Sequence, residues 1–419
     1  RTNAPSMTAC ACSEKTDHPE TLASRNDLAG AYKSAGDLDR AIPIFEQTLD
    51  GFEKLGTDHP NMLASRNNLA IAYESAGDLD RAIPLFERAY ADAVRVLGED
   101  HPTTLAFRNN LAGAYVSAGD LDRAIPLFEC ALNDRVRVLG EDHRDTLASC
   151  SDLAGAHQAV GDLSRAIPLY EHALASYGRT LGQDHPEVLR TRNNLASACV
   201  SAGDLDRAIP LYERNHTDTA RMLGEDHPHT LISRNGLAGA YELAGDLDRA
   251  IPLYECALND RVRVLGEDHR DTLASCSDLA GAYQAVGDLS RAIPLYEHAL
   301  ASYGRTLGQD HPEAIRICNN LASAYYSAGD LNKSIQLLER AQSEATRVFG
   351  EDHPNTLACL GSLAFAHLSA GDPWQALRLY LQTFAGYRRT LGDDHPETRA
   401  VAAKLAEVLE SLDSGPARD

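Results

Sequence analysis

Apolar residues recur along the chain at the spacing of amphipathic helices. In one representative segment, Leu111, Tyr115 and Ala118 are four and three residues apart and therefore fall on one helical face. Phe128 and Leu132, further along the same segment, repeat that spacing. Two such apolar stripes, separated by a Gly-Asp step, predict a pair of helices that each bury one face.

Turn residues mark where each predicted helix begins and ends. Gly119 lies between the two stripes, where glycine fits the left-handed conformation that ends a helix, and Asp120 can cap the helix that follows. Gly140 is expected to end the second helix in the same way. Pro102 marks the start of the first helix, because the missing N–H of proline would be unbonded in the first turn in any case. One unit is therefore a helical hairpin.

The hairpin pattern repeats through the chain with an almost constant period. An Asp-His step recurs every 42 residues, apart from one interval of 41. A fixed period in this range indicates an array of one supersecondary unit stacked on itself. We count nine helix pairs, which start near residues 19, 60, 102, 144, 186, 228, 270, 312 and 354.

The array predicts an all-α solenoid over residues 17–412. A last helix, residues 397–412, is expected to cap it, with a wet outer face and an apolar inner face formed by Val401, Leu405, Val408 and Leu412. Residues 1–16 show no helical pattern and are expected to form a poorly ordered N-terminal tail. Residues 413–419 are expected to form a C-terminal tail.

Proline recurs inside the predicted second helix of seven repeats. If Asp37 and its equivalents cap that helix, these prolines fall in its second turn, where each removes a backbone hydrogen bond and should bend the helix. The alternative is that the helix starts later. Gln336 and Arg378 replace the proline in the last two repeats, whose helices should be straighter. The prolines are Pro43, Pro84, Pro126, Pro168, Pro210, Pro252 and Pro294.

The repeat resembles the tetratricopeptide repeat family. The long period, Asn-Asn-Leu-Ala in the first helix and Leu-Gly-x-Asp-His-Pro at the junction are similar to the kinesin-light-chain type, over roughly residues 17–412. Nothing in the chain matches the heptads by which kinesin light chains meet their motor partner. In the third repeat, the family's signature positions are occupied by Leu111, Ala112, Tyr115, Gly119, Ala124, Phe128 and Ala131.

The resemblance implies a right-handed superhelix of antiparallel helix pairs, with the first helix of each pair lining a concave groove. In related repeat proteins an asparagine row on that helix binds the backbone of an extended peptide, because a carboxamide both donates and accepts. A small residue one turn later leaves room. The alternative is that the asparagines stabilise the stacking. The row here is Asn26, Asn67, Asn109, Asn193, Asn235 and Asn319.

Departures from the repeat are candidates for specificity. Serine replaces the asparagine at Ser151 and Ser277, and glycine at Gly361. Arg190 and Arg316 replace small residues such as Ala64 and Ala106. They could receive a ligand carboxylate or phosphate, or pair with a neighbouring acid. One turn along the groove helix the side chain varies as Lys33, Glu74, Val116, Gln158, Val200, Glu242, Gln284, Tyr326 and Leu368.

Part of the array is duplicated. Residues 130–187 recur as 256–313 with one change, His157 to Tyr283, at an offset of 126 residues, which is three repeats. Two distant parts of the groove should therefore be nearly identical. Both copies also replace the junction proline by arginine, at Arg144 and Arg270.

The net charge limits the class of partner, and the cysteine content bears on the cellular compartment. A formal charge of −22 argues against non-specific nucleic-acid binding and favours basic partners. No apolar run approaches membrane-spanning length and no signal peptide is visible. Reduced thiols and a cytoplasmic protein are therefore expected. The cysteines are Cys10, Cys12, Cys130, Cys150, Cys199, Cys256, Cys276, Cys318 and Cys359.

The periodic histidines invite a metal-site hypothesis. Each belongs to a different repeat, so neighbours should lie about 10 Å apart for each helix between them, whereas zinc needs its ligands about 2 Å from one ion. We therefore interpret them as helix-entry residues and expect no metal and no cofactor. They are His18, His59, His101, His143, His185, His227, His269, His311, His353 and His395.

These observations favour a non-catalytic scaffold that holds an extended peptide or a partner protein in the groove, through the asparagine row with Arg190, Arg316 and Tyr326. A homo-oligomer is left open. A second hypothesis is a sensor or autoinhibitory domain of a larger signalling NTPase, motivated by a chain that begins at Arg1. An enzyme with a site in the groove is the least favoured, because the sequence contains no phosphate loop and no GxSxG elbow.

Overall fold

The computed structural model describes residues 18–56, 60–306, 308 and 310–413, and the regular elements in these residues are α-helices. The helices that open each pair are α2 (Pro19–Ser34), α4 (Pro60–Ser75), α6 (Pro102–Ser117), α8 (Arg144–Ala159), α10 (Pro186–Ser201), α12 (Pro228–Leu243), α14 (Arg270–Ala285), α16 (Pro312–Ser327) and α18 (Pro354–Ser369). The helices that close each pair are α3 (Leu38–Leu55), α5 (Leu79–Leu97), α7 (Leu121–Leu139), α9 (Leu163–Thr180), α11 (Leu205–Leu223), α13 (Leu247–Leu265), α15 (Leu289–Thr306), α17 (Leu331–Phe349) and α19 (Pro373–Leu391). The last helix is α20 (Pro396–Asp413).

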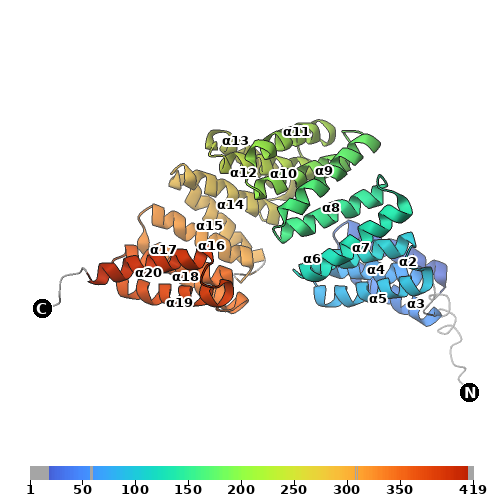
Figure 1. Ribbon diagram of the computed structural model, residues 1–419, viewed down its shortest axis with the longest axis horizontal. Coiled ribbons are helices and arrows are strands. Elements are labelled where there is room, and N and C mark those ends of the chain that lie inside the picture. Colours follow the sequence, from blue (N-terminus) through green and yellow to red (C-terminus); the bar gives the residue numbers. More distant parts are fainter. Residues whose placement is uncertain (1–17, 57–59, 307, 309, 414–419) are drawn as a thin grey trace, which may run out of the picture. The chain divides into compact units, whose positions relative to one another are not determined.

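The chain divides into two compact units, residues 1–211 and residues 212–419, and the division falls within α11. Within each unit, the helices of a pair pack on each other and the second helix packs on the first helix of the next repeat (Figure 1). The predicted α-solenoid of antiparallel helix pairs is thereby confirmed, and the predicted helix starts agree with the observed ones.

The two helices of a pair do not contribute equally to the stacking. First helices of successive repeats contact each other directly, as α4 with α6 and α6 with α8 in unit 1, and α14 with α16 in unit 2. No comparable contact joins successive second helices in the described part of the chain. Helices on the inner side of a curved stack approach one another more closely than those outside. The first helices therefore form the inner face of each unit.

Side-chain caps explain why the helices begin where they do. The imidazole Nδ1 of His101 accepts a hydrogen bond from the Thr103 N–H at 3.2 Å, and Pro102 occupies the first turn of α6. The same cap recurs at His18, His143, His185, His227, His269, His311, His353 and His395. The interpretation of the histidine row as helix-entry residues is thus confirmed where the row is described; His59 lies outside the described residues.

The turn between paired helices is also as predicted. Gly119 has a φ of 77°, and the carboxylate of Asp120 accepts from the Arg123 N–H at 3.1 Å to cap α7. Gly140 ends α7 with a φ of 93° but a ψ of 161°. The expectation that it would repeat the left-handed end of Gly119 is therefore wrong in ψ, because the chain leaves α7 extended toward the next histidine cap.

Small and aromatic residues form the core of each unit. Ala112 and Ala124 are fully buried where α6 and α7 meet, and the absence of larger side chains lets the two helices approach closely. Phe45, Phe52 and Phe86 fill the wider spaces in unit 1 without exposure to solvent. Burial of such rings is the main stabilising contribution, at about 25 cal/mol per Å² of apolar surface.

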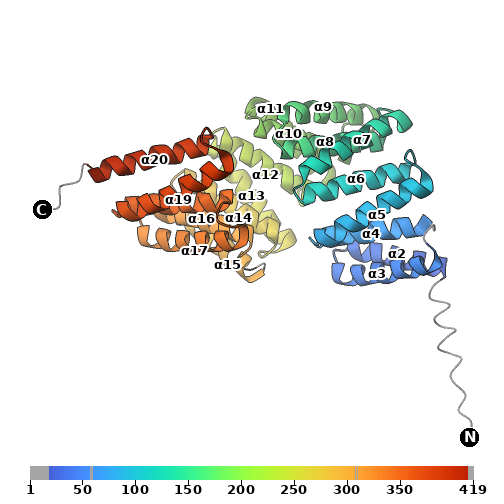
Figure 2. The same ribbon diagram turned by 60° about the horizontal axis from the view of Figure 1, so that its bottom comes forward.

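The C-terminal helix has the amphipathic character expected of a cap. Helix α20 packs on α19 (Figure 2), and its Leu405 and Val408 are buried. Its outer residues are exposed, namely Arg399, Lys404, Glu407 and Glu410. The proposed N-terminal tail, residues 1–16, lies outside the described residues, as do residues 414–419 of the proposed C-terminal tail.

The prolines of the second helices lie inside those helices. Asp120 caps α7 and Pro126 follows in its second turn, so the helix does not start later. The bend expected there stays a prediction.

The seven cysteines of the described residues are all helical and unbonded, and Cys130 and Cys256 are exposed while the other five are buried. In the described chain, no helix combines the length and apolar character needed to span a bilayer.

Candidate functional site

The asparagine row joins neighbouring repeats. The Asn68 Nδ2 donates to Asn26 Oδ1 at 3.4 Å, and Asn110 Nδ2 donates to Asn67 Oδ1 at 3.1 Å. In each case the second asparagine of one repeat bonds the first asparagine of the repeat before it. The carboxamides of Asn26 and Asn67 therefore take part in stacking, which the alternative interpretation anticipates; contact with a ligand stays a prediction for both.

Two other members of the row bond an acid. Asn109 Nδ2 donates to Asp152 Oδ2 at 2.8 Å, and Asn235 Nδ2 donates to Asp278 Oδ2 at 3.0 Å. Both aspartates stand where four of the nine repeats have a second asparagine, so the bond between neighbouring repeats is kept but its acceptor is now a carboxylate. Within the row, the amide oxygens of Asn193, Asn235 and Asn319 are buried and have no hydrogen-bond partner among the described residues.

A cavity of about 520 Å³ opens on the inner face of unit 1. Four successive first helices line it, α4, α6, α8 and α10, so it extends over repeats two to five. Phe128 and Tyr170 close it from the second-helix layer. The other lining residues are Ile71, Glu74, Asn109, Asn110, Gly113, Val116, Ser151, Asp152, Gly155, Ala156, Arg190 and Asn194.

Glycine makes room in this cavity. A Cβ added at Gly113 would have no heavy atom within 4 Å, and one added at Gly155 would meet only the Tyr170 hydroxyl at 3.3 Å. The small residue one turn after Asn109 therefore does leave free space beside it. This is the geometry that an extended chain lying across the first helices would need.

The charged groups of the cavity are held in place. Burial raises the pKa of Asp152, although the hydrogen bond from Asn109 and the positive charges of Arg190 and Arg135 act in the opposite direction. Burial, together with the charge of Asp152, raises the pKa of Tyr170 to about 12, so its hydroxyl stays protonated. The cavity thus presents two carboxylates, one phenol and one guanidinium within a mostly apolar lining.

The predicted arginines both have a local partner. The guanidinium of Arg190 binds Glu187 at 2.7 Å and that of Arg316 binds Glu313 at 2.8 Å, each three residues earlier in the same helix. The alternative of pairing with a neighbouring acid therefore describes their geometry. Arg190 nevertheless lines the cavity beside Asn109, so the structure brings these two predicted site residues together.

Tyr326 and Asn319 line a second, smaller cavity of about 220 Å³ in unit 2. The Tyr326 hydroxyl lies 3.0 Å from the Ser369 hydroxyl, and its ring centroid is 5.2 Å from that of Phe365. The side chain thus bridges α16 and α18 on their inner face. Asn26, Asn67, Asn193, Asn235 and Arg316 line neither cavity.

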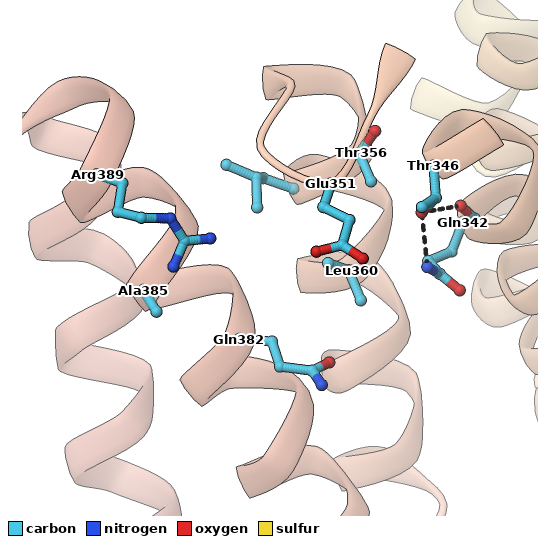
Figure 3. A pocket seen from close by; sticks show the side chains of 9 residues that line it. Gln342, Thr346, Glu351, Thr356, Leu360, Gln382, Ala385 and Arg389 are labelled. Carbon is cyan, nitrogen blue, oxygen red and sulfur yellow. Dashed lines mark hydrogen bonds between the residues drawn. The ribbon is translucent and has the colours of Figure 1, made fainter. Parts of the chain in front are cut away.

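A third cavity, of about 300 Å³, lies among α17, α18 and α19 in unit 2. Figure 3 shows Arg389, from α19, and Glu351, from the turn between α17 and α18, projecting into it, with Gln342 bonded to Thr346 on its rim. Its polar groups bond within the protein, because Arg389 pairs with Asp352 and Thr356 donates to the Gly350 carbonyl oxygen. This cavity is a weaker ligand candidate than the one in unit 1.

Sequence reasoning missed several residues of the first cavity, among them Asp152 and Tyr170. Asp152 differs from the asparagine found at the same place in Asn110, and this departure from the repeat was a usable signal. Tyr170 replaces Phe128 of the previous repeat, another departure, but an aromatic residue there also fits the core pattern. Only the coordinates place its hydroxyl at the cavity.

Comparison with known proteins agrees with this architecture. The sequence model of a family described as tetratricopeptide repeat matches residues 20–93, 62–135, 103–179, 145–215, 208–261, 230–305, 271–343 and 313–389. The chain belongs to the tetratricopeptide repeat family. No curated protein matches the sequence of this tetratricopeptide repeat protein.

Several solved structures are similar to this tetratricopeptide repeat chain. One, titled as kinesin light chain nearly identical TPR-like repeats of Podosopora anserina, is 31% identical, covers 49% of this chain and 98% of its own, and has a TM-score of 0.45. BtubC (BKLC) of P. vanneervenii is 26% identical over 56% of this chain and 94% of its own, with a TM-score of 0.49. The apo form of RapI, at 11% identity and a TM-score of 0.53, covers 68% of this chain and 98% of its own and shares the fold.

Proposed function

We propose that this tetratricopeptide repeat protein is a non-catalytic scaffold that holds an extended peptide segment of a partner on the inner face of unit 1. The observation that carries the proposal is the cavity of about 520 Å³ lined by four successive first helices. A site spread over several repeats suits a long, thin ligand, because each repeat adds a similar set of contacts along one direction.

The polar groups of the cavity are better suited to binding a ligand than to catalysing a reaction on it. Asn109, Asp152 and Arg190 are fixed by bonds to one another or to Glu187, so they can orient a ligand with little loss of side-chain freedom. Asn109 keeps lone-pair capacity on its amide oxygen, and Asp152 accepts one hydrogen bond of the several that a carboxylate can take. These acceptors suit the N–H groups of an extended peptide.

Filling the cavity should abolish binding. Gly113→Phe would place a ring in the open space beside Asn109, and no backbone clash opposes it. For peptides selected from a random displayed library against the full chain, we expect affinity to fall by about tenfold or more, or at least about 1.4 kcal/mol. Fluorescence anisotropy of labelled peptides measures the change.

Gly30→Phe is the matched control. Gly30 holds the same position in the first repeat, also has open space around an added Cβ, and does not line the cavity. Circular dichroism should show both variants folded. Equal binding of the selected peptides by the Gly113→Phe and Gly30→Phe proteins would place the ligand elsewhere and refute the proposal.

A further inference from the structure

The main cavity residues of unit 1 have counterparts in unit 2. The duplicated segment, residues 130–187 and 256–313, carries three of the five, and Arg316 matches Arg190 just beyond its end, where four of the five residues from 188 to 192 differ from those of the other copy. The counterpart of the bond from Asn109 to Asp152 is the bond from Asn235 to Asp278. The corresponding pairs are Asn109 and Asn235, Asp152 and Asp278, Gly155 and Gly281, Tyr170 and Tyr296, and Arg190 and Arg316.

A chain of hydrogen bonds fixes the aspartate of unit 1 as a hydrogen-bond acceptor. Arg135 Nη1 donates to Ser149 Oγ at 2.6 Å, Ser149 Oγ donates to Asn109 Oδ1 at 2.8 Å, and Asn109 Nδ2 donates to Asp152 Oδ2 at 2.8 Å. Arginine has donors only, so Ser149 must accept from it and pass its own proton onward. Asn109 therefore turns its NH₂ group toward Asp152, which favours the ionised carboxylate.

Unit 2 repeats both ends of this chain. Arg261 donates to Ser275, and Asn235 donates to Asp278. Both arginines stand in the second helix before a repeat whose own first-helix arginine is replaced by cysteine, at Cys150 and Cys276. Each unit thus offers a carboxylate on its inner face, supported from behind by a buried guanidinium.

The two sites differ on the wall next to the aspartate. In unit 1 this wall is apolar, formed by Val116 and Phe128. In unit 2 the same positions hold Glu242 and Tyr254, and the Tyr254 hydroxyl donates to Glu242 Oε2 at 2.8 Å. The two differences are coupled, because a tyrosine hydroxyl without the glutamate would lose its partner.

Glu242 lies close to the helix segment that carries Asp278, the aspartate of the unit 2 site. Its Oε1 is 4.0 Å from the position of a Cβ on Gly281, which is on the same helix as Asp278. Burial raises the pKa of Glu242, and the negative charge of Asp278 raises it further. Two neighbouring carboxylates in a partly buried site repel each other, and a cation bound between them relieves the repulsion. In unit 1 the apolar Val116 stands at the position of Glu242, and the other carboxylate that lines the cavity, Glu74, is on α4, two first helices away from Asp152 on α8.

We propose that Asp152 and Asp278 each anchor a lysine or arginine side chain of a bound peptide, and that the neighbouring wall sets a different second preference, for an apolar side chain in unit 1 and for a second basic side chain in unit 2. The guanidinium groups of Arg190 and Arg316 do not cancel the attraction, because Glu187 and Glu313 neutralise them. The formal charge of −22 favours the approach of basic segments. The inference rests on the proposed function and names the ligand class of its site.

Short labelled Gly/Ser peptides with a central Lys-Leu, Lys-Lys, Gln-Leu or Glu-Leu pair test the inference on the full chain. Asp278→Asn leaves only the unit 1 anchor, and this protein should bind Lys-Leu about tenfold tighter than Lys-Lys. Asp152→Asn leaves only the unit 2 anchor and should show the opposite order. Both proteins should bind the Gln-Leu and Glu-Leu peptides at least about tenfold more weakly than their preferred peptide.

Exchanging the walls should exchange the preferences. Val116→Glu with Phe128→Tyr, in the Asp278→Asn protein, should shift the preference toward Lys-Lys. Glu242→Val with Tyr254→Phe, in the Asp152→Asn protein, should shift it toward Lys-Leu. Each exchange introduces residues that the other copy already carries, so folding is expected to persist, and thermal denaturation followed by circular dichroism verifies it.

Unchanged preferences in the exchanged proteins would overturn the role of the wall. Equal binding of lysine-containing and lysine-free peptides, or no binding of any Gly/Ser probe, would overturn the basic anchor. In either case the proposed function still stands if library-selected peptides bind and Gly113→Phe blocks them. It fails separately if Gly113→Phe and Gly30→Phe bind those peptides equally.

Discussion

Arg66→Ala is expected to destabilise unit 1 by about 3–5 kcal/mol, the cost of breaking a buried ion pair. Arg66 is on α4 and is fully buried, and its guanidinium pairs with Asp92 on α5 and, at 3.1 Å, with Glu53 on α3. Alanine would leave a hole among three helices and would remove the buried cation that Asp92 and Glu53 share. Urea unfolding followed by circular dichroism measures the loss, and hydrogen exchange in α4 shows whether the opening is local.

Arg88→Ala is the control for this substitution. Arg88 lies 3.9 Å from the same carboxylate, Glu53, but its side chain is 59% exposed. Exposed pairs of this kind contribute about 0–1 kcal/mol. If Arg66→Ala costs no more than Arg88→Ala, the buried guanidinium does not hold α3, α4 and α5 together.

Gln336→Pro is expected to destabilise unit 2 by about 2 kcal/mol. Gln336 occupies in α17 the position that Pro126 occupies in α7, and proline there would remove the bond from the residue 336 N–H to the carbonyl oxygen of Asn332. An interior proline costs about 3 kcal/mol, but Asn332 is exposed, so water can hydrate the freed carbonyl. Urea unfolding again provides the measurement.

Pro126→Gln supplies the reverse substitution in unit 1. It restores an N–H that can bond the carbonyl oxygen of Asp122, so it should stabilise the protein by a similar amount, about 2 kcal/mol at most. A stabilising Pro126→Gln and a destabilising Gln336→Pro together would show that the prolines are tolerated at a cost. If neither changes stability, the second turn of these helices does not depend on that bond.

The helix boundaries were predictable because they depend on local chemistry. Pro102 can enter a helix only in its first turn without losing a bond, and Gly119 is followed at once by Asp120, a good cap. The role of the histidines at the helix starts was predictable from one observation, namely that each of them directly precedes such a start. Residues within four positions of each other decide all of these features, and a sequence displays that range directly.

The site was less predictable because its contacts join residues about 42 positions apart. The sequence alone does not say whether Asn109 faces a ligand, its own helix or Asp152, since the answer depends on how α6 and α8 are rotated against each other. The same holds for Arg135, which reaches Ser149 from the preceding second helix. The asparagine row is visible as a pattern in the sequence, but its bonds to neighbouring repeats follow only from the structure, and its contact with a ligand stays a prediction.

The duplicated block also affects how the chain reaches its native state. Residues 130–187 and 256–313 are almost identical, so the end of α7, with Arg135, can meet Ser275 on α14 with the same chemistry that it uses for Ser149 on α8. Such a mispairing would loop out three repeats, and each doubling of loop length costs only about 0.6 kcal/mol. Kinetic traps with skipped repeats therefore compete with native stacking. Synthesis from the N-terminus reduces this competition, because α8 emerges long before α14 and can pair with α7 first.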